Sequence, residues 1–182
     1  MSDCSFGCQK NVKESFFNLD NSVENFEMTL KLLDASVNAN IDRFYLASTC
    51  EIFGYQDKVL DEKSDFLPFS PYAVSKVAQD LISKVYFDSY KTNVIRTRGF
   101  NHEGPRRSYN FGLPWYAYQI CRIKKNIQEP IIKTGHRFDK RNFTHVKDMC
   151  NAYLKAVQYS LNVLPARKID EVVVNFFDRL DI

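Results

Sequence analysis

Two residues near the middle of the chain have side chains that could exchange a proton with a substrate. Tyr72 and Lys76 are four residues apart, and in a helix this spacing places them on one face. A neighbouring ammonium favours phenolate, so the pKa of such a tyrosine is expected to fall from about 10 toward neutral pH. The phenol could then act as a general base toward a hydroxyl group. A surface tyrosine packed on a lysine stem has the same spacing, so the pair alone leaves both interpretations open.

The helix that would carry this pair has clear start signals. Ser70 is a favourable N-cap, and Pro71 suits the first helical turn, where its missing N–H costs nothing. We expect the helix to run to about Tyr90. It would therefore hold Tyr72 and Lys76 in its first two turns.

Two polar clusters each follow a short apolar segment that we expect to form a buried strand. Ser48–Glu51 follows the run that begins at Arg43, and Gly99–Arg107 follows the run Asn93–Arg98. Strands alternating with helices predict an α/β fold with a parallel sheet, and ligands bind beyond the carboxyl ends of such strands. We expect both clusters and the start of the Tyr72 helix to meet at one crevice.

The remaining elements follow from periodicity and turn residues. We expect an amphipathic helix over Val23–Val37, with Ser22 as its N-cap and Val23, Phe26, Leu30, Leu33 and Val37 on one side. The other expected elements are a loop over Tyr55–Phe69, helices over Pro114–Lys125 and His145–Tyr159, a basic loop over Gly135–Arg141, and strands over Pro130–Thr134 and Val172–Phe176.

Composition indicates an ordinary globular protein. The 182 residues are 45% hydrophobic and 26% charged, and the net charge of +3 is too small to indicate binding to nucleic acid or membrane. No apolar run approaches the roughly 18 residues of a membrane span, and the first ten residues lack the apolar core of a signal peptide. Five scattered cysteines favour reduced thiols and a cytoplasmic location. Cys4 and Cys8 lack a second Cys/His pair, so no metal is expected.

Five motifs occur in an order that resembles the extended short-chain dehydrogenase/reductases, in particular the GDP-mannose 4,6-dehydratases. The motifs are Ala47–Gly54 (ASTCEIFG), Ser70–Lys76 (SPYAVSK), Phe100–Arg107 (FNHEGPRR), Lys140–Thr144 (KRNFT) and Val146–Met149 (VKDM). The resemblance implies a Rossmann-like parallel sheet with flanking helices. It implies a partial dinucleotide-binding region over residues 1–108 and a partial substrate-binding region over residues 109–182.

The resemblance also implies roles for four catalytic residues. Tyr72 would remove the proton of the sugar 4-hydroxyl while hydride leaves C4, and Lys76 would hold the nicotinamide ribose and lower the Tyr72 pKa. Thr49 would hydrogen-bond the 4-oxygen, and Glu51 would take the C5 proton before water leaves from C6. The implied reaction converts GDP-mannose to GDP-4-keto-6-deoxymannose, a step of GDP-fucose biosynthesis.

Binding residues are implied in the same way. The cofactor would be NADP, with NAD as the alternative, held by Tyr72, Lys76, His102 and Arg107. Asn101 and Arg141 would contact the diphosphate of the sugar nucleotide. Relatives commonly pair through the helices that correspond to Val23–Val37 and Tyr72–Tyr90, which implies a homo-oligomer.

Each of these residues also has a purely structural interpretation. Glu51 could be a solvated carboxylate, Thr49 a turn cap, Asn101 a turn residue and His102 a structural histidine. The cations of the later motifs could form an ordinary basic surface; these are Arg106, Arg107, Arg137, Lys140 and Arg141.

The chain departs from the family pattern at its start. The strand and glycine-rich turn that hold the pyrophosphate are missing, and Gly7 stands alone in this region. We therefore expect a sheet truncated at the N-terminus, with an exposed apolar edge, and dinucleotide binding that is weak or absent. The loop that distinguishes NAD from NADP would belong to the missing segment. The alternatives are a 4-keto-sugar reductase or epimerase of the same family, or a catalytically inactive fragment.

Overall fold

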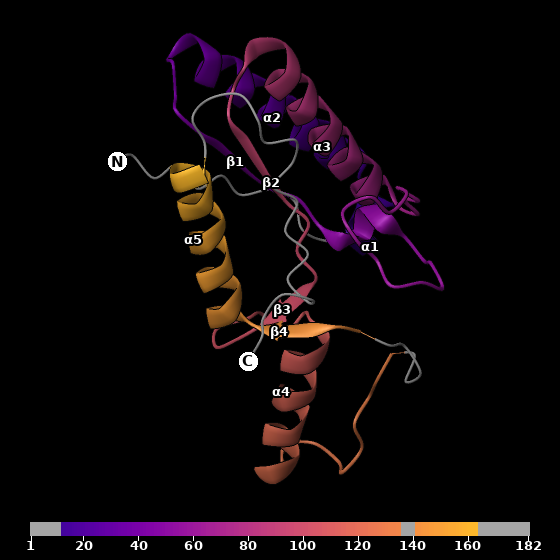
Figure 1. Cartoon of the computed structure of the whole chain (residues 1–182). Coiled ribbons are helices and arrows are strands. Elements are labelled where there is room, and N and C mark those ends of the chain that lie inside the picture. Colours follow the sequence, from indigo (N-terminus) through magenta and orange to yellow (C-terminus); the bar gives the residue numbers. More distant parts are fainter. Residues whose placement is uncertain (1–11, 136–140, 164–182) are drawn as a thin grey trace. The chain divides into compact units, whose positions relative to one another are not determined.

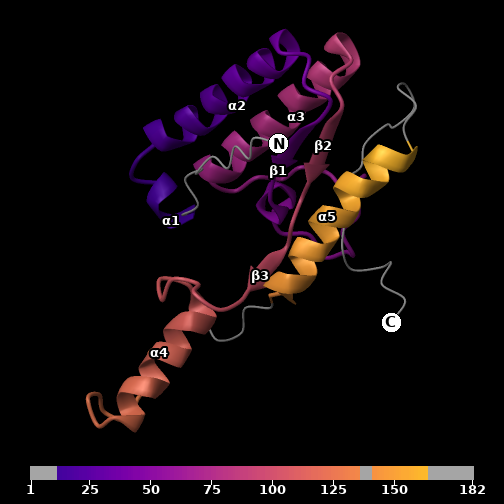
Figure 2. The same ribbon diagram turned by 90° about the vertical axis from the view of Figure 1, so that its left-hand side faces the viewer.

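A computed structural model describes residues 12–135 and 141–163, with side chains as far as residue 158 (Figures 1 and 2). The chain divides into two compact units. Of the described residues, the first unit contains 12–99 and 152–163, and the second contains 100–135 and 141–151. The expected strand over 172–176, the cysteine pair at 4 and 8, and the cations at 137 and 140 lie outside the described residues.

The first unit contains the predicted strands and the predicted Tyr72 helix. Its elements are α1 (Val12–Ser15), α2 (Asp20–Asn38), β1 (Phe44–Ala47), the short 3-10 helix η1 (Cys50–Phe53), α3 (Pro71–Tyr90), β2 (Val94–Thr97) and the second half of α5 (Val146–Val163). The expected helices at α2 and α3, the strands at β1 and β2 and the loop over 55–69 are confirmed, whereas α1 and η1 were not predicted.

β1 and β2 form a parallel pair, in which Phe44 is opposite Val94 and Ala47 is opposite Thr97. α2 and α3 lie side by side on one face of this pair in both views (Figures 1 and 2). The ring of Tyr153, on α5, packs edge-on against the ring of Tyr45, on β1, with the ring centres 5.6 Å apart. Helices thus flank a parallel strand pair, and the predicted α/β, Rossmann-like class is confirmed.

The interface between α2 and α3 is more polar than the sequence pattern suggested. Leu33 and Val23 both belong to the side of α2 that we expected to be apolar and buried. Leu33 is fully buried, whereas Val23 is 55% exposed. The Gln79 amide of α3 donates 2.6 Å hydrogen bonds to the Asn25 carbonyl and the Thr29 hydroxyl of α2. Small hydroxyl side chains also allow the two helices to approach closely. Each of these hydroxyls bonds to a backbone carbonyl of its own helix, which lowers the cost of its burial; they belong to Thr29, Ser36, Ser75 and Ser83.

Ser22 does not cap α2, because the helix begins earlier than the sequence predicted. Its first residue is Asp20 and the N-cap position is Leu19, whose side chain makes no capping hydrogen bond. The carboxylate of Asp20 lies in the first turn, where negative charge stabilises the helix dipole. This charge compensates for the absent cap.

A tyrosine–carboxylate hydrogen bond joins α3 to α2 and predicts a loss of stability at high pH. The hydroxyl of Tyr86 donates to the exposed Asp34, and this bond, followed by partial burial, raises the Tyr86 pKa from 10.0 to about 12. A raised folded-state pKa stabilises the fold fully below the unfolded pKa, and this stabilisation is lost as the pH rises from about 10 through about 12.

We expect Tyr86→Phe to lower the free energy of unfolding by about 1 to 2 kcal/mol near neutral pH, because a hydrogen bond to a charged acceptor is removed. Urea denaturation at a series of pH values measures both proteins. The difference between them should shrink above a pH of about 10. A difference that stays constant to the highest pH would contradict this role of Tyr86.

The second unit contains a parallel strand pair that was not predicted. Its elements are β3 (Asn101–Glu103), α4 (Gly112–Lys124), β4 (Phe143–His145) and the first half of α5. β3 and β4 are parallel, with His102 opposite Thr144. The helices expected over 114–125 and 145–159 are confirmed as α4 and α5, but His145 ends β4 instead of starting the helix.

The strand expected over 130–134 does not form, because its backbone groups pair with side chains of α4 and its flank. The Lys133 carbonyl accepts hydrogen bonds from the Trp115 indole at 3.2 Å and the Gln119 amide at 2.9 Å. The Lys133 N–H donates to the Gln119 amide oxygen at 2.7 Å, and Gln128 donates to the Ile131 carbonyl at 2.9 Å. These bonds replace the ladder that a strand would need.

Across 12–135 and 141–163, no helix is long and apolar enough to cross a membrane.

Candidate active site

Lys76 connects the Tyr72 helix to the end of β1. Its side chain is 5% exposed, and its ammonium donates a 3.3 Å hydrogen bond to the Ala47 carbonyl. The same ammonium lies 5.9 Å from the centre of the Tyr72 ring. Lysine and tyrosine therefore lie side by side on α3, as the spacing predicted, and Ala47 is two residues before Thr49.

The backbone of Tyr72 is anchored from two directions. Its N–H donates to the Ser15 hydroxyl of α1 at 3.2 Å, and the next N–H, of Ala73, donates to the Ser70 hydroxyl at 3.1 Å. Ser70 is the predicted N-cap, and Pro71 has no N–H to satisfy. The first turn of α3 is thus fully hydrogen-bonded, which fixes the backbone that carries the phenol.

Thr49 and Glu51 lie at the start of η1, directly after β1. Thr49 is the N-cap of η1, and its hydroxyl accepts a 3.3 Å hydrogen bond from the Glu51 N–H. Capping uses one acceptor position of the hydroxyl and leaves its proton available to donate. The half-buried Glu51 side chain extends from the first turn of η1.

The first unit therefore groups four of the sequence-predicted site residues. η1 packs against α3, and Lys76 bonds to the strand that leads into η1. Thr49, Glu51, Tyr72 and Lys76 consequently come from two elements in direct contact. This arrangement supplies a phenol, an ammonium, a hydroxyl and a carboxylate, which are the groups needed to move protons on a polyol.

The other predicted site residues belong to the second unit. Asn101 and His102 lie on β3, and the His102 Nδ1 is 3.0 Å from the Phe100 carbonyl. Because a carbonyl only accepts, this contact assigns a ring hydrogen to Nδ1, and in the neutral tautomer Nε2 is then an acceptor. His102 is thereby oriented within its unit.

Arg107 is held by neighbours of its own unit. Its guanidinium lies 3.8 Å from the centre of the Phe111 ring, and its Nε is 3.9 Å from a carboxylate oxygen of Glu103. Arg141 is an exposed residue two positions before β4. A guanidinium is planar, and its geometry suits phosphate oxygens.

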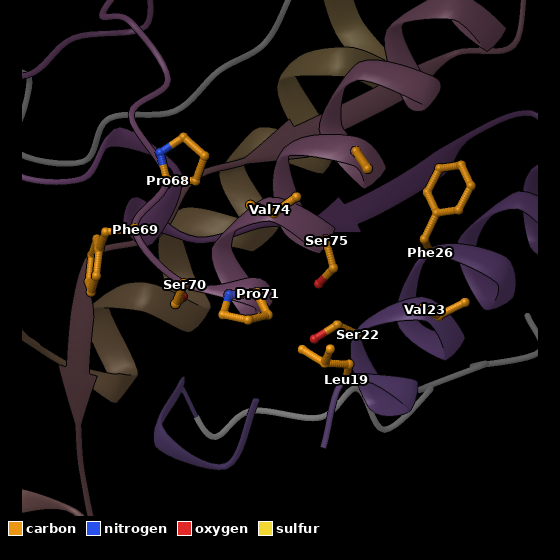
Figure 3. A pocket seen from close by; sticks show the side chains of 11 residues that line it. Leu19, Ser22, Val23, Phe26, Pro68, Phe69, Ser70, Pro71, Val74 and Ser75 are labelled. Atoms are coloured by element: carbon orange, nitrogen blue, oxygen red, sulfur yellow. The ribbon is translucent and has the colours of Figure 1, made fainter. Parts of the chain in front are cut away.

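A groove in the first unit is separate from these polar residues. Its volume is about 570 Å³, and it lies between the start of α2, the segment 68–70 and the first turns of α3. In Figure 3, Leu19, Val23 and Phe26 line one wall and Val74 lies on the opposite side. The lining includes none of the predicted catalytic residues, so this groove is an apolar surface feature.

Comparison with known proteins decides the family. A sequence profile of the family described as GDP-mannose 4,6 dehydratase matches residues 4–174. The chain belongs to this family. It is thereby an extended short-chain dehydrogenase/reductase, as the motifs predicted.

Individual relatives act on more than one nucleotide sugar. GDP-mannose 4,6 dehydratase 2 of Caenorhabditis elegans is 34% identical over 134 residues, which are 71% of this chain and 35% of that protein. The dTDP-D-glucose 4,6-dehydratase of Bos taurus is 31% identical over 155 residues, 84% of this chain and 42% of that protein. The chain spans less than half the length of these two relatives.

Solved structures have the same fold. RMD from Pseudomonas aeruginosa, in complex with NADPH, superposes with a TM-score of 0.80 at 28% identity and covers 84% of this chain and 54% of that one. DesIV, a dTDP-glucose 4,6-dehydratase from Streptomyces venezuelae with NAD and TYD bound, gives a TM-score of 0.73 at 25% identity over 84% of this chain and 46% of that one.

Sequence reasoning missed three residues that support the site. Ser15 bonds to the Tyr72 backbone, Asp80 is a buried carboxylate on α3, and Arg98 binds Asp80. The spacing of Asp80, four residues after Lys76 on the same helix, was a usable signal. No local pattern points to Ser15, because its partner is 57 residues away in sequence.

Proposed function

We propose that this chain contributes the catalytic groups of a GDP-mannose 4,6-dehydratase-like lyase, which makes GDP-4-keto-6-deoxymannose. The observation that carries the proposal is the contact between η1 and α3, which groups Thr49 and Glu51 with Tyr72 and Lys76. Residues 1–108 would serve dinucleotide binding and residues 109–182 substrate binding. Membership of the dehydratase family supports the reaction class.

The chain's own residues would move the protons. Tyr72 would accept the proton of the sugar 4-hydroxyl, and the free donor of the Thr49 hydroxyl would bond the 4-oxygen. Oxidation at C4 makes the C5 proton acidic, and Glu51 would remove it, because a carboxylate is a base of suitable strength for a proton next to a ketone. The C6 hydroxyl would leave as water. Glu51 would pass its proton to the departing C6 hydroxyl, and the proton held by Tyr72 would return to C5. With hydride supplied at C6 by the cofactor, the net change is the loss of one water.

A nicotinamide cofactor, NADP or alternatively NAD, would supply the hydride acceptor and donor. The residues present fit such a group. The Lys76 ammonium has three N–H donors, and its hydrogen bond to Ala47 leaves two that could hold ribose hydroxyls. His102 presents a ring acceptor, and Arg107 a guanidinium for phosphate. Asn101 and Arg141 would contact the diphosphate of the substrate.

The alternative is a GDP-4-keto-6-deoxy-sugar reductase or an epimerase on the same scaffold, or an inactive fragment. The similarity to RMD, whose structure contains NADPH, is the reason to test for an NADPH-dependent reductase. Glu51 favours dehydration, because a simple reductase needs no base at C5. The similarity to a dTDP-D-glucose 4,6-dehydratase makes dTDP-glucose the second substrate to test.

The experiment is an incubation of the 182-residue chain with GDP-mannose or dTDP-glucose and with NADP or NAD, followed by mass spectrometry. We expect GDP-mannose to give a product lighter by one water. Oxidation of NADPH by a 4-keto sugar, without dehydration, would favour the reductase. Calorimetry measures binding of NADP and NAD to the same chain. If neither dinucleotide binds and neither sugar nucleotide gives a product, the inactive fragment would be favoured.

We also propose that two copies associate through the outer faces of α2 and α3. Val23, Val74, Leu81 and Val85 are each about half exposed on these helices, and covering them would remove apolar area from water. The family resemblance supports a second copy as the occupant. Sedimentation at increasing concentration should show a monomer–dimer equilibrium, and a monomer at all concentrations would contradict it.

A further inference from the structure

Asp80 is a buried carboxylate on the helix that carries Tyr72 and Lys76. It is 0% exposed, and two buried arginines of the β2 segment pair with it. Arg96 Nη1 is 2.6 Å from Oδ1, while Arg98 Nε is 2.9 Å from Oδ2 and Arg98 Nη2 is 2.9 Å from Oδ1. The two parallel bonds from Arg98 fix the relative orientation of guanidinium and carboxylate.

Arg98 also contacts the segment that joins η1 to α3. Its Nη1 donates a 2.9 Å hydrogen bond to the Glu62 carbonyl, and its guanidinium carbon lies 4.8 Å from the Phe66 ring centre. The same carbon lies 5.8 Å from the ring centre of Phe53, the last residue of η1. One side chain therefore contacts α3, the 55–69 segment and η1.

The backbone after Arg98 strengthens this connection. The carbonyl of Gly99 accepts a 3.0 Å hydrogen bond from the Cys50 N–H, at the start of η1. The Ile52 carbonyl of η1 accepts a 3.0 Å bond from the Leu67 N–H. η1 is thus bonded on one side to the residue that follows Arg98 and on the other to the segment that Arg98 binds.

We propose that Asp80 and Arg98 are a positioning pair that fixes η1 and the 55–69 segment against α3. The pair thereby sets the places of Thr49 and Glu51 relative to Tyr72 and Lys76. Desolvation offsets much of the attraction in a buried ion pair, so burial of this pair is explained better by its directional bonds than by net stability. The catalytic consequence rests on the proposed function, whereas the structural linkage does not.

Hydrogen exchange of the full 182-residue chain tests the linkage without substrate. The reporters are the hydrogen-bonded amides of Cys50, Gly54 and Leu67. In Asp80→Asn and in Arg98→Lys we expect these amides to exchange about tenfold faster or more, with less change in α2. The double variant should accelerate exchange by less than the product of the two single effects, because both substitutions affect the Arg98–Asp80 bonds. Some additional effect is expected, because Asp80 also bonds to Arg96 and Arg98 also bonds to the Glu62 carbonyl.

Gln79→Met is the matched control, because Gln79 precedes Asp80 but bonds to α2 instead. We expect faster exchange in α2 and little change at the three reporters. Equal acceleration throughout the first unit in Asp80→Asn and Gln79→Met would overturn the proposal, since the pair would then be only a general stabiliser.

A milder variant covers the case in which Asp80→Asn does not fold. Phe66→Leu removes the ring beneath Arg98 and leaves the carboxylate in place. Faster exchange confined to the three reporters supports the proposal, and unchanged exchange there overturns it.

In a turnover assay Asp80→Asn should lower kcat more than it changes KM, and Asp80→Glu should restore part of the loss. Absence of turnover in the wild-type chain would count against the proposed function alone.

Discussion

Tyr72→Phe is expected to reduce turnover of GDP-mannose by about a thousandfold, in line with the loss of a general base. The substitution removes the phenolic oxygen and keeps the ring. Tyr72 as a whole is only 9% exposed, and its backbone N–H is held by the hydrogen bond to Ser15. Folding should therefore be retained, and circular dichroism and thermal unfolding measure this. Formation of the 4-keto product measures activity.

Tyr90→Phe is the matched control for this prediction. Tyr90 ends the same helix, is 57% exposed and stacks on Tyr86, so loss of its hydroxyl should leave turnover unchanged. Persistent turnover in Tyr72→Phe would remove this phenol from the mechanism. If both variants lost activity equally, a general perturbation of α3 would be the better explanation.

The parts of the site that the sequence predicted are those with local signals. Ser70 and Pro71 mark the start of α3, and the four-residue spacing places Tyr72 beside Lys76. β1 was predictable because its residues form an apolar run that ends two residues before Thr49. Local sequence therefore specified the elements that carry the four proposed catalytic residues.

The parts that the sequence missed depend on partners that are distant along the chain. β3 consists of Asn101, His102 and Glu103, which show neither an apolar run nor alternation, and it forms only because β4 pairs with it. The apolar residues before Lys133 resemble a strand, but side chains of α4 take up the backbone groups. In both cases tertiary hydrogen bonds outweigh intrinsic strand propensity.

Gly54→Ala is expected to destabilise the first unit by about 3 kcal/mol or more, a cost typical of a steric and backbone conflict at a special position. Gly54 follows η1 with φ of +61° and ψ of −151°, a conformation that residues with a side chain rarely adopt. A Cβ there would lie 1.9 Å from the Leu67 carbonyl oxygen. Since that atom belongs to the backbone, the 55–69 segment would have to move away from η1.

The control for Gly54→Ala is Gly112→Ala, at the first residue of α4. A Cβ at Gly112 would meet no atom within 4 Å, so we expect its substitution to be neutral or slightly stabilising. Urea denaturation measures both variants. Because Gly54 is three residues after Glu51, displacement of the 55–69 segment should also lower turnover more than the loss of stability alone explains. A fully stable Gly54→Ala protein would show that the backbones at Gly54 and Leu67 do not approach so closely. That result would contradict the tight connection between η1 and the 55–69 segment that leads into α3.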